Sequence, residues 1–389
     1  MSKGFVKLME NEDSTHQINR LSVPHGHVTT KEWVYKHSEL HDQIQYIRVF
    51  PEHKIQRPLP KLKDGSVNHG AFLDQQTVES PEAFVAVIPQ GRVWGTVGFV
   101  ASPDNMLLSD VSNWFNTPAD GHPAFAKSSL PTVCDFEGSV AVLSTAGWWN
   151  YYHWLFDTLP RYELLRKSHI EVDRFVVSFF PDSYQTDTLK ILGVPEVKMI
   201  RCTEMSHIRA ERLVIPSLPG FMGRIPAWVC EFLRRTFLPS EKPKENGRLR
   251  LYISRAKAAG RKIINESKLL DFLLQQNFQL LYLEEIGIHE QVRLFSNAEV
   301  IVAPHGAGLA NLVFCTPGTK VLELLGPQYI NPMFWGLCSH IPLEYRYLIG
   351  EGEQDAAEVN AFSSGNYLAN FAVDVEKVES QLKDWISFK

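Results

Sequence analysis

The stretch EVIVAPHGAGLAN, residues 299–311, decides the fold of the second half of the chain. Its apolar residues before Pro304 can be covered on both faces, as a strand of a parallel sheet requires. Gly306 and Gly308 then remove the Cβ atoms that would keep a ligand away from the backbone, and a helix is expected to follow. Free amides and the positive end of a helix dipole attract an anion. The stretch therefore predicts a phosphate-binding turn beside His305, although a tight turn with a core histidine stays an alternative.

A second junction of the same kind carries a cluster of basic residues. Residues 249–255 (LRLYISR) are typical of a strand, and Asn265 with Glu266 suits the first turn of a helix as an N-cap and a carboxylate at the dipole end. A diphosphate at the first junction needs counter-charge, which arginine supplies with a fixed fork of donors. Solvated loops are often basic as well, so the cluster alone leaves both interpretations open. Its members are Arg255, Lys257, Arg261 and Lys262.

An aromatic segment earlier in the chain brings a histidine and a carboxylate together. The segment is WWNYYHWLFDTLPR, residues 148–161, and a helix is predicted to start near Asn150. His153 and Asp157 are four residues apart, so they share one face of that helix. An aspartate that orients and charges a histidine is an acid–base device. A purely structural pair on an aromatic core helix is the alternative.

Taken together, these segments resemble the family 61 glycosyltransferases, which include bacterial polysaccharide enzymes, plant xylosyltransferases and animal protein O-GlcNAc-transferases. The resemblance covers roughly residues 139–335, and the first hundred or so residues match no family motif. We expect that first stretch to carry family-variable strands and acceptor contacts. The resemblance is carried by Asn150 to Arg161, Ile253-Ser254-Arg255 with Arg261 and Asn265, Glu290-Gln291 with Leu294-Phe295, His305 to Leu309 with Asn311 and Phe314, and Val321 to Leu324.

The resemblance implies an α/β fold of the GT-B-like type, with two Rossmann-like domains facing a cleft. It implies that the C-terminal domain holds a nucleotide sugar, that the N-terminal domain offers the acceptor and the base, and that transfer inverts the anomeric carbon. His153 with Asp157 would then take the acceptor proton, and which of the two is the base stays open. Glu323 would bind ribose hydroxyls, whereas Asn311 would tie down its own loop. The expected donor-binding residues are Arg255, Arg261, His305, Gly306, Ala307, Gly308 and Glu323.

Periodicity and turn residues divide the chain into two units and a terminal helix. We expect an N-terminal acceptor and base domain over 1–237, with 1–138 unmatched, a linker over 238–247, and a C-terminal nucleotide-sugar domain over 248–372. The terminal helix, within 373–389, is expected to pack back on the first domain. Beyond residue 138, the predicted strands are 140–144, 174–179, short ones near 197 and 213, 250–253, 279–283, 300–303 and 320–325. The predicted helices are 150–167 with a kink at Pro160, 184–192, 227–237, 266–276, 289–297 and 309–314.

Composition is typical of an enzyme without a nucleic-acid partner. The 389 residues are 44% hydrophobic, enough for two domain cores, and the net charge of −5 gives no nucleic-acid footprint. No apolar run is long enough to span a bilayer, and the residues after Met1 do not have the pattern of a signal sequence. We therefore expect a cytoplasmic location, with peripheral membrane contact as an open alternative. The five cysteines fit neither a disulfide frame nor a zinc site. The chain has no Asp-x-Asp pair, so we expect no metal, and no cofactor besides a UDP-sugar donor.

Other function classes remain in competition. A nicotinamide oxidoreductase also has a glycine-rich turn, but here Asn311 stands where the third glycine belongs. A GT-B-fold sugar-nucleotide epimerase would share the donor site without needing an acceptor, and a non-catalytic polysaccharide-assembly protein would be inert with every donor. Family members use UDP-xylose, UDP-N-acetylglucosamine and UDP-arabinose, so the resemblance implies UDP and leaves the sugar open. The expected acceptor is a glycan or a lipid-linked glycan.

Overall fold

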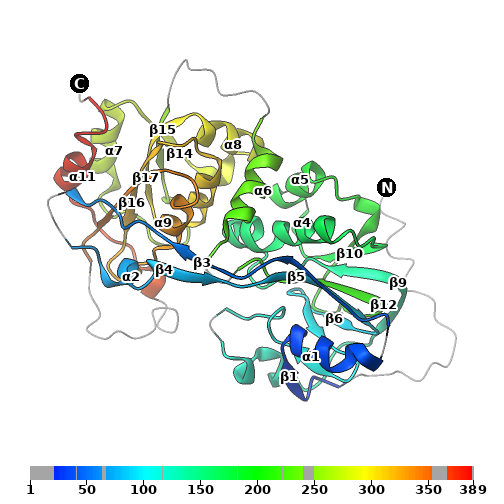
Figure 1. Ribbon diagram of the computed structural model, residues 1–389. Helices are drawn as coiled ribbons and strands as arrows, with labels where there is room; N and C mark the ends of the chain where they lie inside the picture. Colours follow the sequence, from blue (N-terminus) through cyan, green and yellow to red (C-terminus); the bar gives the residue numbers. More distant parts are fainter. Residues whose placement is uncertain are drawn as a thin grey trace.

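Two large β-sheets with helices packed between and around them form the molecule (Figure 1). This computed structural model describes residues 22–40, 42–63, 67–115, 117–181, 183–220, 223–239, 249–352 and 366–387. The expectation of an α/β fold is confirmed. Residues 240–247 of the predicted linker lie outside the described residues. Within the described ranges, no helix combines the length and the apolar character that a membrane span needs.

The first sheet has ten strands and mixes parallel with antiparallel pairs. Its order is β1-β8-β7-β6-β12-β9-β10-β11, and β5 pairs with both β12 and β2. Every residue of β5 is buried, which explains its uninterrupted apolar sequence AFVAVIP. The strands are β1 (Gly26–Val28), β2 (Gln45–Phe50), β5 (Ala83–Pro89), β6 (Arg92–Trp94), β7 (Phe99–Ala101), β8 (Met106–Leu108), β9 (Cys134–Val142), β10 (Arg174–Val177), β11 (Met199–Arg201) and β12 (His207–Pro216); β3 (His53–Gln56) and β4 (Thr77–Ser80) form a separate hairpin.

Helices cover both faces of this first sheet. One face packs against α4, α5 and α6, and the other against α1. The helices of this part are α1 (Thr30–His37), α2 (Gly70–Leu73), α3 (Tyr151–His153), a π-helical turn η5 (Trp154–Thr158), α4 (Leu159–Ser168), α5 (Tyr184–Ile191) and α6 (Ala227–Phe237), with 3-10 turns at Ser38–Leu40, Ala119–Gly121, Pro123–Ala126 and Glu196–Lys198.

The second sheet has five strands, all parallel, in the order β14-β13-β15-β16-β17. This is the order of a doubly wound sheet, with α8, η8 and α9 on one face and α7 and α11 on the other. The elements are β13 (Leu249–Ile253), α7 (Glu266–Gln275), β14 (Phe278–Leu281), η7 (Leu283–Glu285), α8 (Ile288–Ser296), β15 (Ala298–Pro304), the 3-10 helix η8 (Ala307–Phe314), β16 (Lys320–Leu325), α9 (Met333–Cys338), β17 (Glu344–Ile349), η9 (Asn366–Leu368) and α11 (Val375–Leu382).

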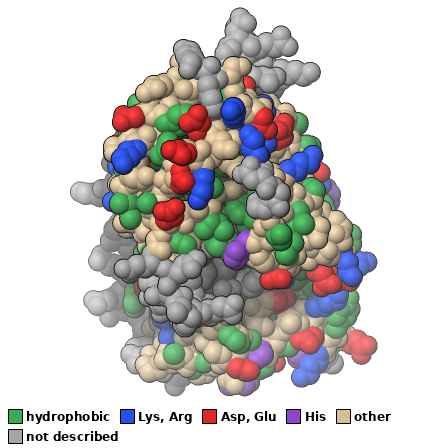
Figure 2. Space-filling view, turned by 90° about the vertical axis from the view of Figure 1, so that its left-hand side faces the viewer, with side chains coloured by type: hydrophobic (Ala, Val, Ile, Leu, Met, Phe, Trp, Pro, Cys, Tyr) green, Lys and Arg blue, Asp and Glu red, His purple; other side chains and the backbone are tan. Residues whose placement is uncertain are grey.

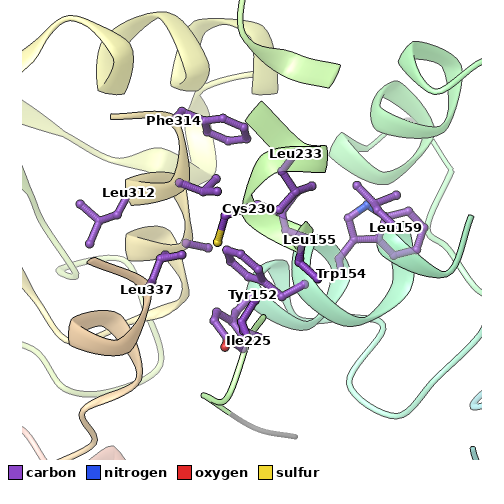
Figure 3. Packing of buried hydrophobic residues seen from close by; sticks show 14 of the residues in the cluster. Tyr152, Trp154, Leu155, Leu159, Ile225, Cys230, Leu233, Leu312, Phe314 and Leu337 are labelled. Carbon is purple, nitrogen blue, oxygen red and sulfur yellow. The ribbon is translucent and has the colours of Figure 1, made fainter. Parts of the chain in front are cut away.

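One hydrophobic core runs from the first sheet to the second. Tyr152 and Leu155 of the first part pack with Leu312 and Leu337 of the second (Figure 3). Arg234 on α6 reinforces this contact, because its Nη1 donates to the backbone carbonyls of Val313 and Cys315, both at 2.6 Å. The two sheets are therefore joined by buried apolar surface around the helix that carries His153.

The terminal helix α11 packs on the second sheet. Its buried Val378 and Leu382 belong to the same cluster as residues of α7 and β15, so its apolar stripe covers that sheet. Lys63 of the first part also reaches this helix, since its Nζ donates to the carbonyl of Ser380 (2.5 Å). The preceding segment is fixed by Asn265, whose side chain exchanges two hydrogen bonds with the backbone of Val373. Asn265 is thus occupied by this segment and makes no side-chain cap on α7, unlike the prediction.

Candidate active site

An irregular helix brings His153 and Asp157 together. Asn150 caps the first turn, since its side chain accepts a hydrogen bond from a backbone amide there (2.9 Å). The α-helical turn then widens into the π-helical turn over Trp154–Thr158 before α4 continues. Pro160 accounts for the widening, because it has no N–H to donate and its ring would clash with a carbonyl of a regular helix. The predicted kink is therefore a π turn, a feature that is frequent at functional sites.

The two side chains form a close and partly exposed pair. Nδ1 of His153 lies 2.6 Å from Oδ2 of Asp157, and the side chains are 14% and 15% exposed. Gly147, with a φ of +81°, makes room for the imidazole, because a Cβ atom there would lie 2.7 Å from Cγ of His153. Phe115 contacts the same ring edge-on at 5.8 Å between centroids. With Nδ1 engaged by the carboxylate, Nε2 is the nitrogen that can meet a substrate.

A second histidine–carboxylate pair lies at the end of β15. Nδ1 of His305 is 2.5 Å from Oε1 of Glu323 on β16, and Tyr345 on β17 donates its hydroxyl hydrogen to the other carboxylate oxygen. Burial lowers the pKa of His305, and the negative charge of Glu323 opposes that shift. Both partners are enclosed, at 3% and 0% exposure of their side chains.

The position of Glu323 changes the role expected for it. A ribose contact requires a carboxylate oxygen at the cavity wall, but both oxygens of Glu323 are hydrogen-bonded inside the protein. Glu323 lies behind His305 and fixes the orientation of its imidazole. The reason is lateral packing: Tyr345 on the neighbouring strand β17 reaches Glu323 with its hydroxyl group and helps to enclose it.

Two partly buried arginines lie beside the turn that follows β15. Nε and Nη2 of Arg255 donate to the carbonyl of Gly260 (3.1 and 2.9 Å), and Arg261 stacks on the ring of Tyr329 at 5.2 Å. Burial lowers the pKa of Arg255 to about 10, and the charge of Arg261 adds to the effect. Burial likewise lowers the pKa of Arg261. Among the described residues, neither arginine has a carboxylate within ion-pair distance, and Nε of Arg261 is buried without a hydrogen-bond partner.

The glycines of the turn are required by close neighbours. A Cβ atom on Gly306 would lie 2.0 Å from Nη1 of Arg255, and one on Gly308 would lie 2.7 Å from a methyl group of Leu283. Gly306 therefore lets the guanidinium lie against the backbone of the turn. Arg255 thus lies directly on the turn for which we predicted anion binding.

Two adjoining cavities collect most of the predicted residues. The larger, of about 930 Å³, is lined by His153 from the first part and by Arg261, His305, Gly306 and Ala307 from the second. A smaller one, of about 280 Å³, is lined by Arg255 and Gly308 together with Ser254, Leu283, Glu284 and Leu309. Trp149 and Gly306 border both cavities. Asp157 and Glu323 lie behind the two histidines.

Asn311 links the turn to the helix that carries His153. Its Nδ2 donates to the carbonyl of Gly308 (3.0 Å) and to the side chain of Gln291 (2.7 Å), and its Oδ1 accepts from the hydroxyl of Tyr151 (2.7 Å). The prediction that Asn311 ties down its own loop is confirmed. The bond to Tyr151, two residues before His153, additionally fixes the position of the turn relative to the start of the helix.

Sequence reasoning missed several residues that shape the cavity. Tyr329 follows β16 and Phe115 precedes β9, and both contact the predicted histidines. Tyr329 had a signal, because it lies just beyond the carboxyl end of a parallel strand, where ligands bind in such sheets. Phe115 had none, since its contact with His153 depends on the antiparallel part of the first sheet.

Fold and cavity together define an α/β protein with a cavity and two arginines at the carboxyl edge of a parallel sheet. Residues 151–322 match the family model described as Glycosyltransferase 61. Similar proteins include the EGF domain-specific O-linked N-acetylglucosamine transferase of Rattus norvegicus, 31% identical over 202 residues (45% of this chain, 38% of that protein). A beta-1,2-xylosyltransferase of Oryza sativa subsp. japonica is 46% identical over 55 residues (14% and 10%). The Protein O-linked-mannose beta-1,4-N-acetylglucosaminyltransferase 2 of Xenopus laevis is 40% identical over 81 residues (20% and 14%).

Residues 151–322 thus match a glycosyltransferase 61 domain, and the resemblance predicted from the motifs is confirmed. The matched range contains His153, Asp157, both arginines and the whole turn after β15. The aligned parts span less than two fifths of each of these relatives' own length.

Proposed function

We propose that the protein is an inverting, metal-independent glycosyltransferase that moves a sugar from a UDP-sugar to a hydroxyl group of a glycan or lipid-linked glycan, in polysaccharide biosynthesis. The observation that carries this proposal is that one cavity is lined both by Arg261 with the Gly306 turn and by His153, which pairs with Asp157, while Arg255 lies against the same turn. The family match supports glycosyl transfer, and the relatives include a xylosyltransferase and an N-acetylglucosamine transferase.

The donor would lie across both cavities. In this arrangement the diphosphate meets Arg261 and the amides of Gly306 and Ala307, while Arg255 adds positive charge from beneath the turn. The uridine would enter the smaller cavity, whose apolar wall includes Leu283 and Leu309. A bound anion would stabilise the charged form of these guanidinium groups, because its negative charge offsets the cost of their burial.

The chemistry then divides between the two sides of the cavity. Nε2 of His153 removes the proton from the acceptor hydroxyl as that oxygen bonds to the anomeric carbon, and the bond from that carbon to the diphosphate oxygen breaks. UDP leaves with its electron pair, and Arg261 with the turn amides stabilises the charge. Asp157 holds the imidazole and stabilises its protonated form. Attack opposite the diphosphate inverts the anomeric carbon.

Metal independence follows from the source of positive charge. The chain has no Asp-x-Asp pair, and Arg255 and Arg261 offer two cations at the place where the diphosphate would lie. Turnover is expected to survive EDTA unchanged. Loss of turnover with chelator and full recovery with manganese would contradict this part of the proposal.

We further propose a GT-B-like division of labour between the two sheets. The N-terminal domain over 1–237 would present the acceptor and the base, and the C-terminal domain over 248–372 would bind the donor. The placement of His153 on a helix of the first part, and of the arginines and the turn on the second sheet, supports this division.

The deciding experiment is a thermal-shift screen followed by activity assays. UDP and UDP-sugars, including UDP-xylose, UDP-N-acetylglucosamine and UDP-arabinose, should raise the melting temperature, since a ligand at a hundred times its Kd adds about 2.7 kcal/mol of stability. Transfer to a glycan acceptor should follow with one of them. Conversion of a UDP-sugar without acceptor would point to an epimerase instead, and no response to any UDP compound would end the proposal.

A further inference from the structure

A basic pocket opens on the first part of the molecule, at the end of α4 away from His153. It has a volume of about 560 Å³ and lies between β2, the last turn of α4 and the last turn of α6. Three chain segments that are distant in sequence thus contribute cations to one hollow. Its lining residues are Ile47, Arg48, Val49, Glu163, Arg166, Lys167, His169 and Arg235.

Glu163 organises the pocket from below. Its side chain is 4% exposed, and its two carboxylate oxygens bind Nη1 of Arg166 (3.0 Å) and Nη2 of Arg235 (2.8 Å). Both arginine side chains remain mostly exposed, at 60% and 58%. Each guanidinium uses one nitrogen on Glu163 and keeps further N–H donors for another acceptor. The buried carboxylate therefore holds two arginines in fixed positions, which lowers the entropy lost when they bind a ligand.

The other cations of the pocket are poorly compensated. Arg48 lies 3.5 Å from Glu82, but Glu82 already pairs more closely with Lys31 at 3.2 Å. Lys167 lies over the ring of Phe50 at 5.5 Å, and no carboxylate of the described residues pairs with it. Lysine and arginine thus supply four charges in the lining against the single carboxylate of Glu163. On the face shown in Figure 2, by contrast, basic and acidic side chains alternate.

We propose that this pocket is a second anion site, which binds a phosphate or diphosphate group outside the donor cavity. Arginines match the oxygens of phosphate with their fixed fork of donors, and Lys167 adds charge at the rim. Basic side chains in the last turn of a helix also interact favourably with the negative end of the helix dipole. That role alone would require neither a pocket nor a buried carboxylate shared by two arginines. The site lies at the opposite end of the helix from His153, so it binds independently of the donor.

The test is calorimetric titration of inorganic pyrophosphate into the full chain at low ionic strength with saturating UDP, which occupies the proposed donor site. The variant Arg48→Gln/Lys167→Gln should bind pyrophosphate at least tenfold more weakly than wild type. The matched control, Lys36→Gln/Lys190→Gln, removes two exposed lysines from the last turns of α1 and α5 and should change nothing. Equal affinity in both double variants, or no pyrophosphate binding beside UDP, overturns the site.

The single variant Lys167→Gln replaces the double variant if that one does not fold, because this side chain is exposed and makes no ion pair among the described residues. If UDP fails to bind, the proposed function is wrong. The phosphate site is judged separately, by whether the pocket variants bind pyrophosphate more weakly than wild type. Flotation with phosphatidylglycerol vesicles and with pure phosphatidylcholine vesicles identifies the source of the phosphate. Pocket-dependent binding to the anionic vesicles assigns a lipid headgroup, and pyrophosphate binding without vesicle binding assigns a soluble phosphate; either result supports the site.

Discussion

The cavity contains two histidine–carboxylate pairs with similar distances and different surroundings. His153 and Asp157 are 2.6 Å apart and 14% and 15% exposed, whereas His305 and Glu323 are 2.5 Å apart and 3% and 0% exposed. The first pair comes from one helix, four residues apart, and the second from two neighbouring strands. The imidazole of the first pair lines the cavity, but charging the second pair's histidine is opposed by burial and by two arginines.

A histidine paired with a carboxylate can serve for proton transfer or for rigid positioning, depending on its surroundings. A base must change its charge during turnover, which a partly exposed imidazole does at lower cost. A positioning pair gains from burial, because enclosed hydrogen bonds restrict its geometry. We therefore expect substitutions in the first pair to act on kcat and those in the second to act on donor binding.

The largest effect is expected at the first pair. His153→Ala and Asp157→Asn should each lower kcat by about a hundredfold or more, because the acceptor proton loses its base or the base loses its orientation. UDP affinity should stay within a small factor, since neither residue meets the diphosphate in the proposed arrangement. Kinetics, UDP titration and melting curves on both variants provide the measurement.

A structural role for this pair gives another pattern. The melting temperature would fall and turnover per folded molecule would remain near normal. Normal kcat in folded His153→Ala would exclude this histidine as the base.

The next effect is expected at the arginines. Arg261→Ala should weaken UDP by about tenfold or more while uridine binding hardly changes, because the lost partner faces phosphate. Lys262→Ala, one residue further in the same loop, is the matched control. Equal losses for UDP and uridine would contradict the diphosphate assignment. Arg255→Ala should show the same preference together with some loss of stability, since Arg255 also ties down Gly260.

A smaller effect is expected at the buried pair. Glu323→Gln should weaken UDP by roughly fivefold, the equivalent of about 1 kcal/mol for one altered hydrogen bond, because the amide offers a single acceptor oxygen to two donors, Nδ1 of His305 and the hydroxyl of Tyr345. Its effect on kcat at saturating donor should be far below that of Asp157→Asn. If Glu323→Gln instead lowers kcat as much as Asp157→Asn with unchanged UDP affinity, the roles of the two pairs are reversed.

The same comparison explains what the sequence could predict. The first pair follows from a spacing of four within one helix, and the strands and helices of the second sheet follow from uniform apolar runs between glycine and polar turns. The place of Glu323 depends on Tyr345, which reaches it across the sheet from another strand, and no local pattern encodes such a lateral contact. The π turn was likewise hidden, because Pro160 predicts a disturbance of the helix but not its form.

The first sheet shows the same limit on a larger scale. Its predicted strands near β9, β10 and β12 belong to repeated strand and helix units, where a period of two or of 3.6 is visible. The strands β6, β7 and β8 have three residues each; they pair antiparallel in sequence order, and β6 also pairs with β12 far along the chain. So short a segment shows no period, and Phe115 reaches His153 only through this part of the sheet.

The smallest effect concerns stability against pH. Burial lowers the pKa of His305, so the folded state binds its proton less tightly than the unfolded state does. Stability should therefore fall as pH drops below about 6.5, the ordinary histidine value, and should level off below the lowered folded pKa. His122, His207 and His340 are shifted in the same direction by burial, so they contribute to the same slope.

His305→Asn, whose amide can still donate to Glu323, should reduce the decline in melting temperature between pH 7 and about pH 5 without removing it, and the exposed His289→Asn is the matched control. An unchanged slope in His305→Asn would show that His305 gains its proton as readily in the folded state, and the buried pair would then be as able as the first to act as a base.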